Sequence, residues 1–171
     1  ARIHGISYPS RTIDKDFGKG MKREEDERFQ IGLFHCNAGG DPRHDPYAPR
    51  SVADLEESKL DYWALGHIHE RITLSASDPF IGYPGNTQGR HIIESGPRGC
   101  LFVNVSANGK LAELPEFVPT DRVRWSPCRL DIAGMETIDD LLDESPQNSS
   151  LATQETLDVP LAFEQPMPML K

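Results

Sequence analysis

Asp61-Tyr-Trp-Ala-Leu-Gly-His-Ile-His69 is the stretch of sequence that decides the fold. Residues 61–65 form a largely apolar run of strand length, and a run without polar alternation suits a strand that is covered on both faces. A similar run, Phe29-Gln-Ile-Gly-Leu-Phe34, lies upstream and is followed directly by His35. Two buried strands of this kind predict a sheet of the α/β class.

The rest of the chain predicts short strands separated by turns, with few helices. A helix is expected after Ser51, which is a good N-cap, and another after Thr137, while the charged residues 18–28 suit a surface helix or loop. Asn108-Gly109 between apolar runs predicts a hairpin. The remaining strands are expected at 2–8, 70–74, 80–83, 100–105, 111–118 and 123–132.

Composition excludes several classes of protein. The 171 residues have a formal net charge of −9 and contain three cysteines, an odd number that argues against a disulfide framework and for a cytoplasmic setting. The negative charge is uneven: residues 136–171 carry −7 and residues 1–135 only −2, so a polyanionic substrate is not excluded. The sequence contains no block of five basic residues, so it does not predict a surface that coats nucleic acid. It also contains no apolar run long enough to predict a membrane span.

Three histidines follow the two apolar runs: His35 after the first, and His67 and His69 after the second. Sites in open α/β sheets collect beyond the carboxyl ends of strands, so neighbouring strands would bring these imidazoles together. A single histidine in such a place is usually structural, but three of them predict a metal site. Asn37 and Glu70 are possible partners that orient the imidazoles.

The motifs around these histidines resemble those of the calcineurin-like metallophosphoesterases. Leu33-Phe-His35 and Trp63-Ala-Leu-Gly-His-Ile-His69 are similar to the last two motif blocks of that family. A wider set is similar to the bacterial DNA-repair exonuclease branch, whose nuclease subunits partner an SMC-like ATPase: Tyr47-Ala-Pro49, Tyr83-Pro-Gly-Asn86, Gln88-Gly-Arg-His91 and Glu94-Ser-Gly-Pro-Arg-Gly-Cys100.

The resemblance implies an α/β (α+β) fold that is part of a two-sheet β-sandwich flanked by helices. Residues 1–133 would be the carboxyl-terminal half of the phosphoesterase domain, with strands from 61 onwards forming its second sheet. Residues 134–171 would be a linker or the start of a capping region, acidic and partly disordered.

The resemblance also implies a site that holds two divalent metals, with Mn the first expectation and Zn, Fe or Mg the second. His35 and His67 would bind one metal and His69 the other, and such a pair of ions clamps a phosphate and activates water. Asn86, Arg90 and His91 lie in a turn-rich loop and are possible substrate-binding residues, or otherwise part of a solvated loop. The implied partners are DNA and an SMC-like ATPase, with no membrane.

The sequence departs from the family because it contains no Asp-x-His or Gly-Asn-His block, and because Asp14, Asp16, Asp41 and Asp45 lack the strand-then-Gly context of the Gly-Asp block that supplies the bridging carboxylate. We therefore expect no complete catalytic set in these 171 residues, and no hydrolysis of DNA without the amino-terminal half of the same domain. The leading expectation is a DNA exonuclease of the repair type. The alternatives are a calcineurin-like phosphoesterase with a non-DNA substrate and a non-catalytic metal-binding scaffold.

Overall fold

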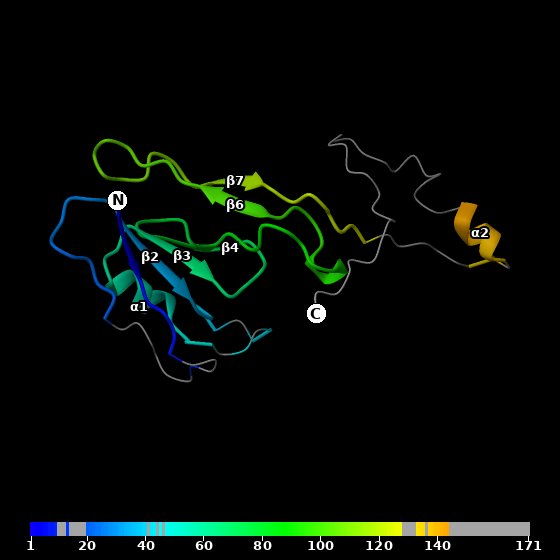
Figure 1. The fold of residues 1–171 in the computed structure, drawn as a ribbon, viewed down its shortest axis with the longest axis horizontal. Coiled ribbons are helices and arrows are strands. Elements are labelled where there is room, and N and C mark those ends of the chain that lie inside the picture. Colours follow the sequence, from blue (N-terminus) through cyan, green and yellow to red (C-terminus); the bar gives the residue numbers. More distant parts are fainter. Residues whose placement is uncertain are drawn as a thin grey trace, which may run out of the picture. The chain divides into compact units, whose positions relative to one another are not determined.

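The computed structural model describes residues 1–9, 13, 20–40, 42–43, 45, 47–127, 133–135 and 137–143 (Figure 1). The chain divides into two compact units: residues 1–88 with 97–121, and residues 89–96 with 122–171. The predicted strand at 128–132 and the predicted disorder of 145–171 fall outside the described residues. In the part of the chain that is described, no helix is long and apolar enough to cross a membrane.

A five-stranded sheet forms the centre of the first unit, which confirms the predicted α/β class. Its strands are β1 (Arg2–Gly5), β2 (Gln30–His35), β3 (Tyr62–Gly66), β4 (Ile72–Ser75) and β5 (Phe80–Tyr83). They are arranged in the order β1-β2-β3-β5-β4, with only β4 antiparallel to its neighbour. β2 pairs with β3 from Ile31 opposite Tyr62 to His35 opposite Gly66, so the carboxyl ends of the two strands meet at one edge.

The division into sheets differs from the expectation that a second sheet starts at residue 61. β3 joins β2 in the same sheet, because residues 31–35 pair in parallel with residues 62–66. The separate two-stranded sheet is formed by β6 (Gly99–Phe102) and β7 (Glu116–Pro119).

The strand predicted at 123–132 is wrong over its described part, residues 123–127, which are irregular. Here Trp125 forms its hydrogen bonds with residues 89–96 of the same unit, and not with a neighbouring strand. Trp125 accepts a hydrogen bond at its carbonyl from the Gly96 amide (2.9 Å), and its indole nitrogen donates to the Gly89 carbonyl (3.1 Å).

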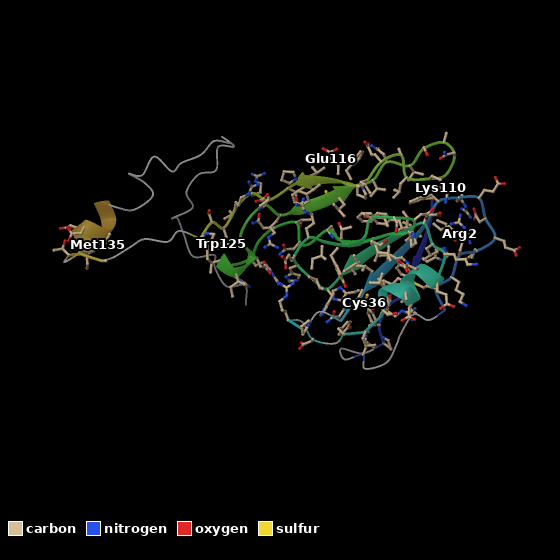
Figure 2. The ribbon with its side chains drawn as sticks, turned by 180° about the vertical axis from the view of Figure 1, so that it is seen from behind. Arg2, Cys36, Lys110, Glu116, Trp125 and Met135 are labelled. Atoms are coloured by element: carbon tan, nitrogen blue, oxygen red, sulfur yellow. The ribbon has the colours of Figure 1, made fainter. Side chains whose placement is uncertain are left out.

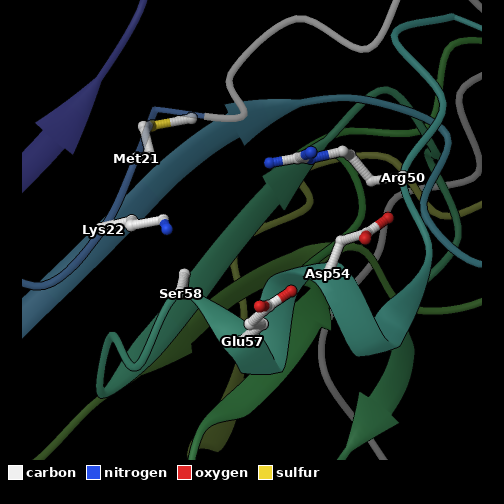
Figure 3. Close-up of a pocket in the computed structure, with 6 residues that line it drawn as sticks. All are labelled: Met21, Lys22, Arg50, Asp54, Glu57 and Ser58. Atoms are coloured by element: carbon white, nitrogen blue, oxygen red, sulfur yellow. The ribbon is translucent and has the colours of Figure 1, made fainter.

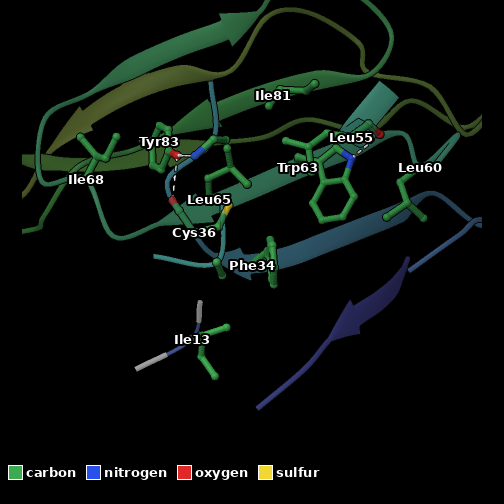
Figure 4. Close-up of a cluster of buried hydrophobic side chains, with 12 residues drawn as sticks. Ile13, Phe34, Cys36, Leu55, Leu60, Trp63, Leu65, Ile68, Ile81 and Tyr83 are labelled. Atoms are coloured by element: carbon green, nitrogen blue, oxygen red, sulfur yellow. Dashed lines mark hydrogen bonds between the residues drawn. The ribbon is translucent and has the colours of Figure 1, made fainter. Parts of the chain in front are cut away.

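One face of the five-stranded sheet packs against α1 (Val52–Glu57), and Ser51 is its N-cap as predicted, forming a capping box with Asp54. Trp63 is fully buried there and donates from Nε1 to the Leu55 carbonyl at 2.9 Å (Figure 4). Tyr83 ties the end of β5 to the segment after β2, because its hydroxyl donates to the Cys36 carbonyl at 2.9 Å. The end of β2 is therefore fixed on its buried side.

The opposite face of the sheet carries Phe29, Tyr62 and Phe80, and residues of the β6–β7 layer pack against them. The turn between the predicted strands at 100–105 and 111–118 is the predicted hairpin: Val105 bridges Leu111, and Gly109 has a φ of +75°. Lys110 follows that turn (Figure 2) and donates to Asp78 Oδ2 at 2.9 Å.

In the second unit, the short helices are η1 (Ile92–Glu94) and α2 (Ile138–Asp143). Thr137 caps α2 as predicted, since its Oγ1 accepts from the Asp140 amide at 3.2 Å. Residues 20–28 contain no helix, which leaves a charged loop as the correct alternative for that segment.

Candidate metal centre

His35 and His67 lie side by side at the carboxyl edge of the sheet. His35 is the last residue of β2, and His67 follows β3 directly. Their ring centroids are 5.3 Å apart, with the ring planes inclined by 72°. The parallel pairing of β2 and β3 therefore brings together two of the three predicted ligands.

Burial and the neighbouring histidines lower the pKa of His35. Desolvation is the largest cause, and the charges that His67 and His69 would carry when protonated add to it. His69 is thus part of the same electrostatic cluster. A lowered pKa favours neutral imidazole, which is the form that binds a metal ion.

His67 has a strained backbone and a ring that is held from two sides. Its φ of +99° is a conformation that costs a non-glycine residue about 1–3 kcal/mol and persists only where neighbours enforce it. The Tyr47 ring stacks on the imidazole with centroids 5.6 Å apart, and Nε2 lies 3.3 Å from the Asp45 carbonyl oxygen. A carbonyl can only accept, so this contact selects the tautomer with the proton on Nε2 and the lone pair on Nδ1.

Asn37, predicted as an orienting residue, holds the loop that contacts His67. Its side-chain nitrogen donates to the same Asp45 carbonyl at 3.2 Å, and its backbone amide donates to the Tyr47 carbonyl at 2.8 Å. Asn37 therefore acts on His67 through the backbone of the loop.

Sequence reasoning missed two tyrosines that position His35. Tyr47 meets the His35 ring edge-on at 5.6 Å, and the Tyr8 hydroxyl donates to the His35 carbonyl at 2.5 Å. The Tyr47-Ala-Pro49 string was the available signal for the first, whereas nothing in the sequence pointed to Tyr8.

Gly66 leaves the room in which the His35 ring lies. A Cβ atom at position 66 would be 2.9 Å from His35 Nδ1, closer than side-chain carbons normally approach. The glycine in the Gly-His-x-His string is thus explained by the packing of the opposite imidazole.

The other predicted residues have varied surroundings. Glu70 is exposed and pairs with Arg43, its Oε2 lying 3.3 Å from the arginine Nη2. Asn86 lies in the first unit and donates from its backbone to the His69 carbonyl at 3.3 Å. Arg90 and His91 belong to the second unit, where the Arg90 amide donates to Glu94 Oε2 at 2.7 Å and His91 is exposed.

A pocket of about 210 Å³ that is open to solvent lies elsewhere, lined by none of these predicted residues (Figure 3). Its walls are formed by Met21, Lys22, Arg50, Asp54, Glu57 and Ser58.

The residues present fit only part of a metal site. Imidazole nitrogens suit Zn and Fe and are also found on Mn, and the 5.3 Å between the ring centroids of His35 and His67 fits two ligands of one ion. Among the described residues, however, no group of three or more His, Cys, Asp or Glu side chains is arranged to hold a metal ion. Further ligands are needed to complete a centre here.

Imidazoles lie together beyond two neighbouring parallel strands of a mixed sheet. This arrangement suits a metal-assisted hydrolase or a metal-binding module. Over 132 residues the chain is 42% identical to a protein of Bacillus subtilis (strain 168) that is named uncharacterized metallophosphoesterase YhaO. The match covers 77% of this chain, and it supports the metallophosphoesterase superfamily and a calcineurin-like fold. It covers 32% of the relative, so the chain spans about a third of that protein's length. No family model matches the chain.

Proposed function

We propose that this chain contributes three imidazole ligands to a metal-dependent phosphodiesterase that acts as a DNA exonuclease in repair. The observation that carries the proposal is the 5.3 Å separation of the His35 and His67 rings beyond β2 and β3, in a chain 42% identical to a metallophosphoesterase. His35 and His67 would hold one metal and His69 the other, with Mn favoured over Zn, Fe or Mg.

The residues described here would bind and orient rather than transfer protons. His35, His67 and His69 would hold part of a two-metal site, which would supply stabilisation of charge on the phosphate oxygens and activation of water. The lowered pKa of His35 keeps that ligand neutral, and the Asp45 carbonyl fixes the tautomer of His67. Both effects prepare nitrogen lone pairs for a cation.

The missing carboxylates would come from the amino-terminal half of the same domain. An uncovered apolar surface supports this part of the proposal: Ile3 is 67% exposed and Leu33 is 57% exposed on the face of the sheet that β6 and β7 cover further along. Leu33 and His35 are two residues apart on one strand and so lie on one face. Polypeptide that covers Leu33 would reach the edge at which His35 ends.

Metal titration tests whether the site is divided in this way. We expect the 171-residue chain to bind Mn²⁺ weakly, with fewer than two ions per chain, in isothermal titration. Two tightly bound ions per chain would contradict the divided site. One tightly bound Zn²⁺ with no gain of hydrolysis in the longer protein would instead support a non-catalytic scaffold, the alternative favoured by the absence of a complete ligand group among the described residues.

The substrate is tested with the product of the complete reading frame that contains these residues. We expect Mn²⁺-dependent degradation of linear duplex DNA, reduced about a hundredfold or more by His67→Ala. His4→Ala, in β1, is the matched histidine control, because the His4 ring contacts Gln30 and has no part in the candidate site, and it should stay within about twofold of the unchanged protein. Hydrolysis of bis-p-nitrophenyl phosphate without degradation of DNA would favour the non-DNA phosphoesterase.

The proposed partner is an SMC-like ATPase in the cytoplasm, on the strength of the motif resemblance. Co-purification of the complete protein with an SMC-like ATPase of the same organism tests it. Stimulation of DNA degradation by ATP only when both are present is the expected result.

A further inference from the structure

The backbone carbonyl of His69 is surrounded by donors from two segments that are distant in sequence. Arg98 Nη1 donates to this oxygen at 2.5 Å, and the Asn86 amide donates to it at 3.3 Å. The same Arg98 nitrogen lies 3.4 Å from Asn86 Oδ1, so the guanidinium joins the turn at 84–86 to the histidine segment.

The turn around this carbonyl is built for close approach. Gly85 has a φ of +82°, and a Cβ atom there would lie 2.7 Å from the His69 oxygen. Only glycine combines that conformation with that contact without strain. The Tyr83-Pro-Gly-Asn86 string therefore encodes a turn that fits over one carbonyl group.

The backbone of Arg98 is fixed by hydrogen bonds. Its carbonyl accepts from the Thr120 amide at 2.9 Å and the Asp121 amide at 3.2 Å, just beyond β7. The neighbouring Gly99 amide donates to the Asn86 carbonyl at 3.1 Å. The Arg98 side chain is therefore attached to a fixed backbone, and it is half-buried. Its bond to the His69 carbonyl is charge-assisted, and such bonds are about twice as strong as neutral ones.

We propose that Arg98 and Asn86 form a clamp on the His69 carbonyl, and that Arg98 is a positioning residue for the His69 imidazole. The inference rests on the proposed function of His69 as a metal ligand. His67 is held by Tyr47 and the Asp45 carbonyl, whereas His69, two residues later, is held by this clamp. The two histidines are therefore held by separate sets of contacts.

The clamp is tested first without any metal, in the 171-residue chain. Arg98→Met removes the donors and keeps the length of the side chain, and Arg98→Lys keeps the charge and a donor. Arg71→Met is the matched control, since Arg71 lies over the Phe117 ring at 4.1 Å and provides a different arginine contact in the same unit.

In Arg98→Met we expect amide hydrogen exchange of Asn86 to accelerate about tenfold, because the His69 carbonyl that accepts from this amide is no longer held by the guanidinium. We also expect the His69 ring signals to shift in NMR spectra. Arg98→Lys should restore part of the protection, and Arg71→Met should leave Asn86 unchanged. Unchanged exchange and ring signals in Arg98→Met would overturn the clamp, as would an equal acceleration in Arg71→Met.

The second readout is paramagnetic broadening of the His69 ring signals by Mn²⁺. Loss of a residue that orients a ligand typically weakens metal binding about 10–100-fold, so the Mn²⁺ concentration for half-broadening should rise by about that factor in Arg98→Met. An unchanged concentration would contradict the positioning role. Absence of broadening in the unchanged chain would count against the metal site itself, whereas the exchange experiment would still decide the clamp.

Discussion

Gly66→Ala should displace one imidazole of the candidate centre without removing any ligand. The added Cβ atom would lie 2.9 Å from His35 Nδ1, whereas unstrained contact needs about 3.5 Å, so the ring must retreat by about 0.6 Å. Gly66 has no left-handed backbone conformation that a side chain would strain. The change therefore acts on the position of His35.

A displacement of this size is large for a metal ligand. Sites must be held within about 0.5 Å of their working geometry, and a misplacement of 1 Å can cost a hundredfold in rate. We therefore expect about tenfold weaker Mn²⁺ binding, measured as the concentration that half-broadens the His35 ring signals. Replacing glycine by alanine restricts the unfolded chain, so the melting temperature should stay the same or rise slightly.

Gly32→Ala is the matched control on the same pair of strands. Its Cβ atom would overlap Cε3 of Trp63, which is fully buried and cannot move aside. Overpacking of this kind costs about 1–3 kcal/mol, so the melting temperature should fall while Mn²⁺ binding by the folded fraction is unchanged. The reasoning is refuted if Gly66→Ala leaves both the His35 signals and their Mn²⁺ dependence unaltered, or if Gly32→Ala weakens binding equally.

Three further predictions concern the framework that carries the site. Trp63→Ala should lower the free energy of unfolding by about 3–5 kcal/mol in urea, because it empties the core beside α1 and removes the donor to the Leu55 carbonyl; a loss below 1 kcal/mol would be inconsistent with full burial. Iodoacetamide at pH 8 should label the exposed Cys100 and leave Cys36 unreacted, since burial raises the pKa of the Cys36 thiol to about 12; a labelled Cys36 peptide from folded protein would contradict this. Ser51→Ala should cost about 1 kcal/mol by removing the cap of α1, with Ser51→Asp retaining most of the stability in the same unfolding assay.

The strands and the pairing of two histidines could be predicted because both depend on local patterns. The apolar runs before His35 and His67 predicted β2 and β3, and the parallel pairing of these strands brings their carboxyl ends to one edge. The strand expected at 123–132 failed over its described part because strand propensity does not specify a partner. Trp125 satisfies its carbonyl and indole nitrogen in the 89–96 loop instead.

The supports of the imidazoles could not be predicted, because they are mostly backbone atoms brought from distant parts of the chain. No feature of the sequence predicts that the Asp45 carbonyl accepts from both His67 and Asn37. Arg98 in a Gly-Pro-Arg-Gly string is equally typical of a plain turn, and only the fold shows its nitrogen on the His69 carbonyl.

These supports bear on how a divided site could assemble. His67 is kept at a φ of +99° by contacts within this chain, so the strain is already present before any metal or further ligand arrives. A preformed pair of imidazoles does not have to be ordered when carboxylates are added, which lowers the entropy cost of completing the centre. In the proposed divided site, the remaining ligands would need only to approach an edge that contacts of Tyr47, Asp45 and Arg98 hold in place, and loosening any of these contacts should weaken metal binding more than it weakens the fold.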